Sequence, residues 1–207
     1  MRLMSTSTKP SKTDVVTDFR RSQILDAARD AFTKQGLAGT TVEGIAKRAG
    51  VAKGTVYLYY RSKEEILRQV LDEDLAELKD DTVPLLSQPG SIEQKLTAFL
   101  TASLTFFDRK RDFFEHAHFE MTPEVRRKAL QKLETVYKAQ HGAWREALTS
   151  ARDAGLVGDI DPDASAVAIV ALASGLAKQR LRGWTATPVA SSALQAGATI
   201  WKGLAAR

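Results

Sequence analysis

The chain has 207 residues, of which 43% are hydrophobic, and it carries a net charge of +5. It contains no cysteine, which excludes disulfide bonds, thiolate metal sites and a thiol nucleophile. The longest apolar run, residues 164–177, spans 14 residues, fewer than the roughly 20 that a membrane-spanning helix needs. These features predict a globular, cytoplasmic protein without membrane contact.

Charge is unevenly distributed along the chain. Residues 1–63 hold 12 Lys and Arg against 5 Asp and Glu, a balance of +7, whereas residues 64–207 hold 18 against 20, a balance of −2. A basic segment attracts and steers a polyanion such as nucleic acid. Because a solvated charged surface would give the same balance, the charge indicates a nucleic-acid partner only together with a binding motif.

Residues 1–17 are rich in Ser, Thr and Lys and lack the apolar centre of a signal peptide. We predict a disordered arm here, and its cations either touch DNA or belong to an untethered terminus. Those cations are Arg2, Lys9 and Lys12. The first helix is predicted from Asp18 to Gln35, because an apolar stripe runs along it and Gly36 follows as a stop signal. The stripe consists of Phe19, Ile24, Ala27, Ala28, Ala31 and Phe32.

Residues 40–50 predict a short helix followed by a tight turn. Thr40 and Glu43 have the spacing of a capping box, which sets the start of this helix. Its apolar face consists of Val42, Ile45, Ala46 and Ala49, which recur at helical spacing. Gly50 allows the left-handed conformation of a tight turn. With the next helix this segment makes a helix-turn-helix, whose second helix can enter the major groove of DNA.

The second helix of this motif, from Lys53 to Tyr60, is polar and aromatic. It presents Lys53, Thr55, Tyr57 and Tyr59 without any Asp or Glu. Ammonium, hydroxyl and phenol groups hydrogen-bond phosphate oxygens, and Gly54 removes a side chain so that the helix can approach the duplex. The alternative is an amphipathic helix whose tyrosines only cover the core.

The next helix is predicted to begin at residue 63. Ser62 has the position of its cap, with Glu65 as the partner in a capping box. Lys63 then lies in the first turn, where a cation opposes the helix dipole by a few tenths of a kcal/mol. The sequence therefore suggests an external anion as the partner of Lys63.

These motifs resemble the DNA-binding domain of the tetracycline-repressor (TetR) family of bacterial regulators, over about 25 contiguous residues. The matching residues are Thr40-Thr41, Ile45-Ala46, Ala49-Gly50-Val51, Gly54-Thr55, Tyr57, Tyr59-Tyr60 and Ser62-Lys63-Glu64. The chain departs from the family at Ala52, where a capping serine is common, and at Tyr60, which replaces a buried phenylalanine.

The resemblance implies which residues face DNA, mostly its phosphates. They are Thr41, Lys53, Gly54, Thr55, Tyr57, Tyr59 and Lys63. Lys53, Gly54 and Tyr57 would lie nearest to the bases. Since such regulators act as twofold dimers, the resemblance also implies a palindromic operator as the DNA partner.

Helical patterns continue through the rest of the chain, and period-two alternation is nowhere sustained. The predicted ranges are 63–80, 91–108, 112–121, 123–154, 162–181 and 188–206. Pro84, the turn formers at 87–91, Gly155 and Gly183 separate them. We therefore expect an all-α chain of about nine helices. A three-helix DNA-binding domain would occupy 18–63, and a larger domain for ligand binding and dimerisation would occupy 64–207.

The last two predicted helices, within residues 162–206, are rich in small and apolar residues such as Gly197 and Ile200. They hold more apolar surface than a terminal hairpin can bury against one neighbour. Burial within the monomer is one interpretation. The resemblance favours the other, a homodimer in which these helices pair with their copies in a four-helix bundle.

Six of the eight phenylalanines lie between residues 99 and 119. They either line a ligand pocket or simply pack the core. The candidate ligand contacts are Phe99, Phe107, Phe114 and Trp144. A metal site is not expected, because His116 and His118 point about 200° apart on a helix. The run Arg109-Lys110-Arg111 is interpreted as a solvated face.

The resulting hypothesis is a dimeric transcriptional regulator, a repressor that a small apolar or aromatic ligand releases from its operator. The alternative is a DNA-binding regulator without a small-molecule ligand, acting constitutively or through a protein partner. No nucleophile elbow, phosphate-binding loop or carboxylate pair suggests an enzyme, and no cofactor is expected. A closed, ligand-sized cavity beside the four aromatic residues would favour the first hypothesis, whereas a solid core would favour the second.

Overall fold

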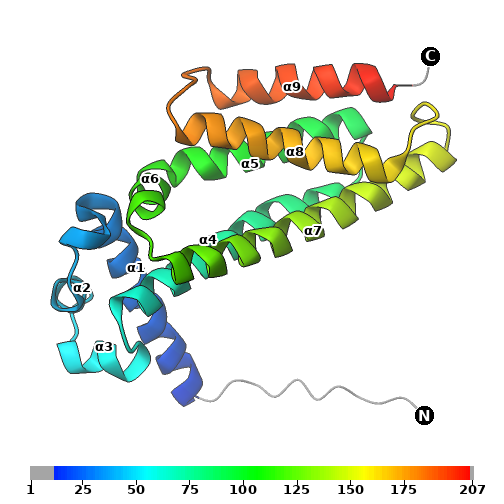
Figure 1. Ribbon diagram of the computed structural model, residues 1–207. Helices are drawn as coiled ribbons and strands as arrows, with labels where there is room; N and C mark the ends of the chain where they lie inside the picture. Colours follow the sequence, from blue (N-terminus) through cyan, green and yellow to red (C-terminus); the bar gives the residue numbers. More distant parts are fainter. Residues whose placement is uncertain (1–11, 206–207) are drawn as a thin grey trace, which may run out of the picture. The chain divides into compact units, whose positions relative to one another are not determined.

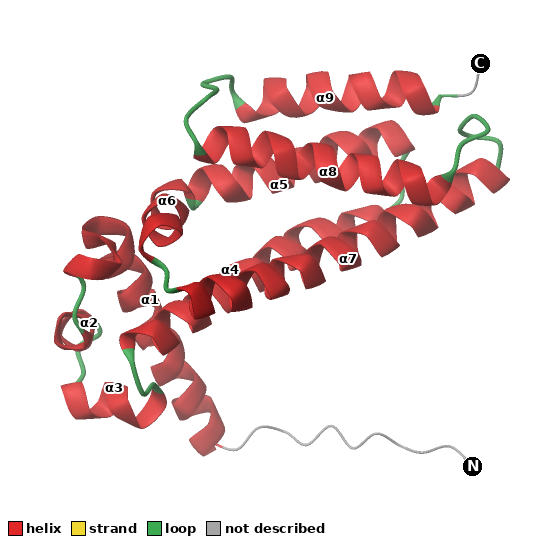
Figure 2. Ribbon diagram, viewed as in Figure 1, coloured by secondary structure: helices red, strands yellow, loops and turns green. Residues whose placement is uncertain are grey.

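The computed structural model describes residues 12–205 and the side chains of residues 16–117 and 120–205. Within that part of the chain every regular element is a helix (Figure 2). In chain order (Figure 1) they are α1 (Lys12–Gly39), α2 (Val42–Arg48), α3 (Lys53–Tyr59), α4 (Lys63–Thr82), a 3-10 turn η1 (Val83–Leu86), α5 (Ile92–Arg109), α6 (Arg111–Glu120), α7 (Pro123–Asp153), α8 (Pro162–Leu181) and α9 (Val189–Leu204). The prediction of an all-α chain with about nine helices is confirmed.

The chain divides into two compact units between Val70 and Leu71, a border that lies inside α4. The first unit contains α1, α2, α3 and the start of α4. Its core is formed by side chains that are almost completely buried, namely Ile24, Ala28, Phe32, Ile45, Val56 and Ile66. α2 packs against both α1 and α3. The predicted stripe on α1 is therefore the buried face of this helix, except for Phe19, which is exposed.

α1 begins earlier than predicted, whereas the predicted stop signal at Gly36 coincides with a break in the helix. It begins at Lys12 instead of Asp18, because nothing between Pro10 and Asp18 breaks a helix. Of the predicted arm, residues 1–11, with Arg2 and Lys9, lie outside the described residues. At the other end Gly36 interrupts the helix with φ 69° and ψ 175°, a conformation open to glycine.

The start of α2 is also shifted from its prediction. Thr41, not Thr40, is the N-cap, and its Oγ1 accepts a hydrogen bond from the Gly44 amide at 3.0 Å. The Thr40 hydroxyl instead donates to the Gly36 carbonyl oxygen at 2.7 Å. Thr40 thus stabilises the end of α1, and the capping box predicted with Glu43 is wrong by one residue.

The second unit is built around α5, which packs on both α8 and α9, while α7 packs on α8 and η1. α5 begins with a complete capping box between Ser91 and Gln94. Thr122 caps α7 and Asp161 caps α8, each by accepting from backbone amides of the first turn. These caps explain why the predicted starts of the three helices agree with the structure to within a residue. No helix in residues 12–205 is long and apolar enough to cross a membrane.

Candidate nucleic-acid interface and regulatory core

A tight turn joins α2 to α3 in the first unit. Gly50 adopts φ 64°, and the Val51 amide donates to the Ala46 carbonyl oxygen at 3.0 Å, which closes the end of α2. Ala52 precedes α3 and makes no side-chain cap, as expected from its methyl group. The two helices and their turn have the arrangement that the sequence predicts for a helix-turn-helix.

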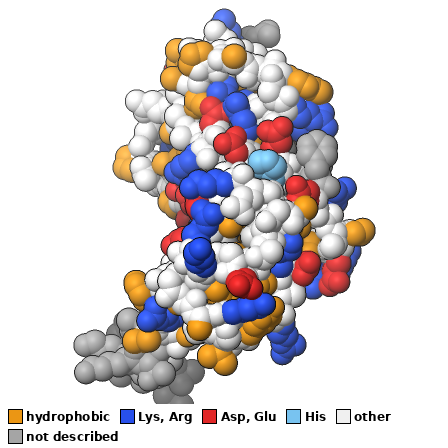
Figure 3. All heavy atoms as spheres, turned by 90° about the vertical axis from the view of Figure 1, so that its left-hand side faces the viewer, with side chains coloured by type: hydrophobic (Ala, Val, Ile, Leu, Met, Phe, Trp, Pro, Cys, Tyr) orange, Lys and Arg blue, Asp and Glu red, His pale blue; other side chains and the backbone are white. Residues whose placement is uncertain are grey.

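α3 is anchored on one face and free on the other. Val56 is fully buried, and Thr55 and Tyr59 are half-buried. Lys53, Gly54, Tyr57 and Leu58 are exposed, and this set of four is called the free face below. Figure 3 views the chain from the left-hand side of Figure 1, and basic, acidic and apolar side chains are mixed on the face that it shows. The alternative, in which α3 only covers the core, thus fits its anchored face but not its free face.

Gly54 lies on the free face with space around it. Apart from its chain neighbours and the backbone of its own helix, a Cβ atom added there would meet no atom within 4 Å. Packing inside the protein therefore does not require glycine at this position. The open space is what close approach of another backbone would need.

Thr41 and Lys53 both keep hydrogen-bonding capacity for a partner. Thr41 is exposed, and its oxygen accepts from the Gly44 amide, so its hydroxyl proton is available to a phosphate oxygen. The Lys53 ammonium lies 3.7 Å from the Glu43 carboxylate, and both side chains are more than half exposed. Such a pair contributes little to stability, so a phosphate can replace the carboxylate.

Lys63 has partners inside the protein. Its ammonium donates to the carbonyl oxygens of Leu37, at 2.6 Å, and Thr40, at 2.9 Å. These carbonyls lie at and just beyond the C-terminal end of α1, where no further helical turn supplies amides to them. An external anion is therefore not needed to explain a lysine in the first turn of α4. Ser62 caps this turn as predicted, while Glu65 accepts from the Arg61 amide.

Leu58 is the residue of the free face that the sequence analysis missed. Its side chain is 82% exposed, the largest value among the exposed large hydrophobic side chains of the described residues. Leucine is not among the hydrogen-bonding residue types by which the sequence of α3 indicates DNA binding. Sequence spacing does indicate its position, because Leu58 lies four residues after Gly54 and on the opposite side of the helix from the buried Val56.

In the second unit the four candidate ligand contacts form two separate aromatic pairs. Phe99 and Trp144 are fully buried, with ring centroids 5.5 Å apart at 90°. Phe107 and Phe114 have ring centroids 5.7 Å apart. Such edge-on and tilted contacts are typical of a packed core. A ligand among these rings would have to displace side chains.

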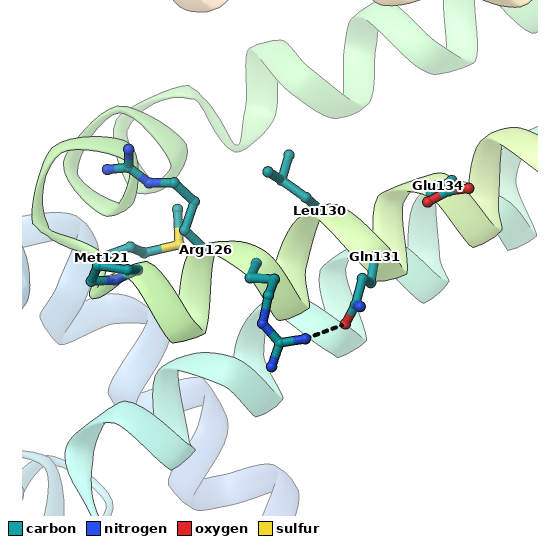
Figure 4. Close-up of a pocket in the computed structure, with 7 residues that line it drawn as sticks. Met121, Arg126, Leu130, Gln131 and Glu134 are labelled. Atoms are coloured by element: carbon teal, nitrogen blue, oxygen red, sulfur yellow. Dashed lines mark hydrogen bonds between the residues drawn. The ribbon is translucent and has the colours of Figure 1, made fainter.

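A small cavity of about 10 Å³ lies beside Phe107, between α4, α5, α7 and α8. It is lined by Leu78, Ser103, Phe107, Tyr137, Gln140, Val170, Ala173 and Ser174. It has room for about one water molecule. A larger hollow of about 450 Å³ is a groove on the surface at the start of α7 (Figure 4), beside the exposed Leu130. A closed, ligand-sized cavity beside the four aromatic residues would have favoured regulation by a small molecule. The structure shows a packed core there instead.

The small cavity has a polar lining that the sequence analysis did not anticipate. Ser103 is 4% exposed, and its hydroxyl has no hydrogen-bond partner among the described residues. The Tyr137 hydroxyl bonds with that of Ser174 at 2.9 Å, and Gln140 Nε2 donates to Thr82 Oγ1 at 2.9 Å. Burial raises the pKa of Tyr137, and the hydrogen bond with Ser174 opposes that rise. An occupant would therefore meet hydroxyl groups as well as apolar walls.

The prediction that Arg109-Lys110-Arg111 is a solvated face holds for the exposed Arg109 but is wrong for Lys110, whose side chain is 13% exposed. The Lys110 ammonium lies 2.7 Å from the Asp74 carboxylate, which is completely buried, and 3.0 Å from that of Glu77. Arg109 pairs with Glu77 and Asp81 of α4. Arg109 and Lys110 thus meet acidic side chains of α4, a contact between distant segments that the sequence pattern does not reveal.

A second ionic contact joins α5 and α8. Arg180, with a side chain 6% exposed, donates from Nε and Nη2 to the Asp108 carboxylate at 2.9 and 2.7 Å. Its Nη1 also donates to the Thr187 carbonyl oxygen at 2.7 Å. The hydrogen bond from Arg180 lowers the pKa of Asp108, opposed by the burial of the carboxylate. Asp108 therefore favours its charged form in the folded protein.

The comparisons with known proteins agree on one family. Residues 24–70 match the model of the bacterial regulatory proteins, tetR family. The HTH-type transcriptional regulator TtgR of Pseudomonas putida is 29% identical over 175 residues, 81% of each chain. The HTH-type transcriptional repressor KstR2 of Mycolicibacterium smegmatis is 30% identical over 152 residues, 70% of this chain and 71% of its own. The chain belongs to the TetR family of transcriptional regulators.

The TetR fold extends over both units of the chain. A TetR-family transcriptional regulator from Mesorhizobium loti has the same fold, with a TM-score of 0.73 at 19% identity over 91% of this chain and 98% of its own. Members of the TetR family are DNA-binding transcriptional regulators, typically repressors, and not enzymes. Within the described residues, no three His, Asp or Glu side chains are placed to hold a metal ion. The His118 side chain lies outside the described residues.

Proposed function

We propose that this TetR-family protein is a dimeric repressor that binds a palindromic operator through α3 and its surroundings. The free face of α3 carries the proposal, because it offers an ammonium and a phenol, lacks acidic residues, and leaves Gly54 open to close approach. Lys53, Gly54 and Tyr57 would lie nearest to bases, with Thr41, Thr55 and Tyr59 on phosphates. DNA binding is assigned to residues 18–63, and regulation and dimerisation to 64–207.

Lys63 is proposed to contribute less to DNA binding than the other contact residues. Two of its three ammonium protons are directed to carbonyl oxygens of the chain. Only the third is available to a phosphate. We therefore assign Lys63 first to holding α4 against the end of α1, and second to DNA.

Dimerisation is proposed through α8 and α9, within residues 162–206. Val167 is 53% exposed on α8, and Leu194 is 61% exposed on α9. A dimer contact through these helices would bury such side chains. Gly197 faces inward instead, since an added Cβ would lie 3.2 Å from Thr97 Oγ1 of α5. A substitution at Gly197 would therefore disturb the monomer and does not test the interface.

Release by a small molecule is proposed as the regulatory step, with a revised ligand chemistry. The cavity beside Phe107 holds only about one water molecule, so a ligand would have to displace side chains to reach the Ser103 and Tyr137 hydroxyls. A ligand that does so would combine apolar surface with a hydroxyl or carbonyl oxygen. Its effect on operator affinity is limited by its differential affinity for the two states of the regulator, about 2.7 kcal/mol for a 100-fold preference. The second candidate, regulation without a small molecule, is favoured by the solid core around Phe99 and Trp144.

The test is selection of bound fragments from random DNA, followed by titration of the enriched operator at fixed salt. Tyr57→Ala and Lys53→Ala should each weaken operator binding by about 1 to 3 kcal/mol for a true base contact, and weaken binding to random DNA less. Trp184→Ala, at an aromatic side chain 68% exposed in the second unit, is the control and should leave operator affinity unchanged. Unchanged operator affinity in the folded Tyr57→Ala protein would remove the assignment of α3.

A further inference from the structure

Leu58 stands alone on the free face as a large apolar side chain without a polar group. It is 82% exposed, while Val56 on the opposite side of α3 is fully buried. Residues four apart lie above one another on a helix, so Leu58 follows Gly54 along the same line. Lys53 and Tyr57 lie along one side of that line, and Thr55 and Tyr59 lie along the other. The centre of the free face is therefore apolar, with hydrogen-bonding groups beside it.

This arrangement restricts what Leu58 can recognise. A leucine side chain can neither donate nor accept a hydrogen bond, so phosphates and the polar edges of bases gain nothing from it. The C5 methyl group of thymine is the apolar group that the base pairs display in the major groove. Because Gly54 has no side chain, α3 can come close enough for Leu58 to cover such a methyl group.

We propose that Leu58 is a specificity-determining residue that reads thymine in the operator through its 5-methyl group. The proposal rests on the proposed function, since it requires that α3 enters the major groove. In a twofold dimer, each half-site would contain one such thymine, at symmetry-related positions. Tyr57 and Lys53 then hold the helix in register by polar contacts, while Leu58 selects the base.

The experiment replaces each thymine of the selected operator, one at a time, by deoxyuridine, which removes only the methyl group. Wild-type protein should bind about fourfold more weakly at one position per half-site, the effect of removing one buried methyl group. Leu58→Ala should bind the thymine operator more weakly than the wild type does, and should not distinguish thymine from uracil there. Leu58→Met, which keeps an apolar contact, should retain the discrimination. Leu130→Ala, at a leucine 59% exposed in the second unit, is the control and should behave like the wild type.

The outcomes separate this inference from the proposed function. Equal discrimination by wild type and Leu58→Ala would overturn the role of Leu58, as would a wild type that is insensitive to every methyl group. In both cases an enriched operator to which Tyr57→Ala binds more weakly would still support DNA binding by α3. Failure to enrich any sequence would overturn the proposed function, and the role of Leu58 with it. Circular dichroism of each variant confirms that the compared proteins are folded.

Discussion

Replacing Lys63 by methionine tests whether this lysine serves the fold or the DNA. The substitution keeps the apolar stem but removes two hydrogen bonds from the ammonium to Leu37 and Thr40. A hydrogen bond to a charged group contributes about 1.5 to 3 kcal/mol, and partial exposure places these two at the lower end. We therefore expect the first unit to lose about 2 to 3 kcal/mol of unfolding free energy, after allowance for the stem that remains.

The placement of the tryptophans makes this loss measurable in one unit at a time. Trp144, Trp184 and Trp201 all lie in the second unit. Amide hydrogen exchange in peptides from α2 and α3 should report the full loss in Lys63→Met, whereas the urea transition followed by tryptophan fluorescence should shift less. Lys53→Met is the matched control. Its exposed ion pair of 3.7 Å contributes little, so stability should change by less than about 0.5 kcal/mol while operator affinity falls.

An effect of Lys63→Met on DNA binding without an effect on stability would refute the structural role of Lys63. If Lys63 acts only on a phosphate, Lys63→Met would leave exchange in α2 and α3 unchanged. It would then weaken binding to all DNA sequences equally and reduce the salt dependence by about one unit per site. That result would show the two carbonyl contacts to contribute nothing to stability.

Three further predictions concern the second unit. The lowered pKa of Asp108 means that its contact with Arg180 stabilises the fold above the ordinary carboxyl pKa of about 4 and is lost as pH falls through the lowered value. Asp108→Asn should therefore flatten the decline of unfolding free energy in acid, and an unchanged acid limb would contradict this. Leu194→Asp should yield monomers in sedimentation, whereas Leu130→Asp should not; a wild-type monomer at micromolar concentration would exclude the proposed dimer. Ser103→Ala removes a buried hydroxyl without a partner and should raise unfolding free energy by about 1 kcal/mol, while a similar fall would indicate a bound water in the cavity.

The sequence predicts most helices well because their ends carry local chemical signals. Ser91, Thr122 and Asp161 cap helices whose predicted starts agree with the structure to within a residue. Where competing residues stand side by side, local signals are less decisive, as at Thr40 and Thr41. The start of α1 was missed because a Ser- and Thr-rich composition was read as disorder, although the residues after Pro10 are compatible with a helix.

Contacts between distant residues were the part that local reasoning missed. The carbonyl partners of Lys63 lie 23 and 26 residues away, and a charged first-turn lysine looks the same in sequence with or without them. Arg180 and Asp108 are 72 residues apart. Pairing of such groups depends on how helices are arranged, which periodicity does not encode. The packed rings of Phe99 and Trp144 likewise could not be distinguished from a pocket wall by spacing alone.

The contact between Asp74 and Lys110 limits the paths by which such a sequence can evolve. Asp74 is completely buried, so losing the lysine would leave a carboxylate in the interior, at a cost of about 3 to 5 kcal/mol. Replacing both residues by apolar ones of similar volume is close to neutral or stabilising. During evolution this ion pair can therefore be lost without a large loss of stability only if Asp74 is replaced by a neutral residue first, or if both residues are replaced together. Homologues aligned at these two positions should be charged at both or neutral at both, and those with a lysine alone should outnumber those with an aspartate alone.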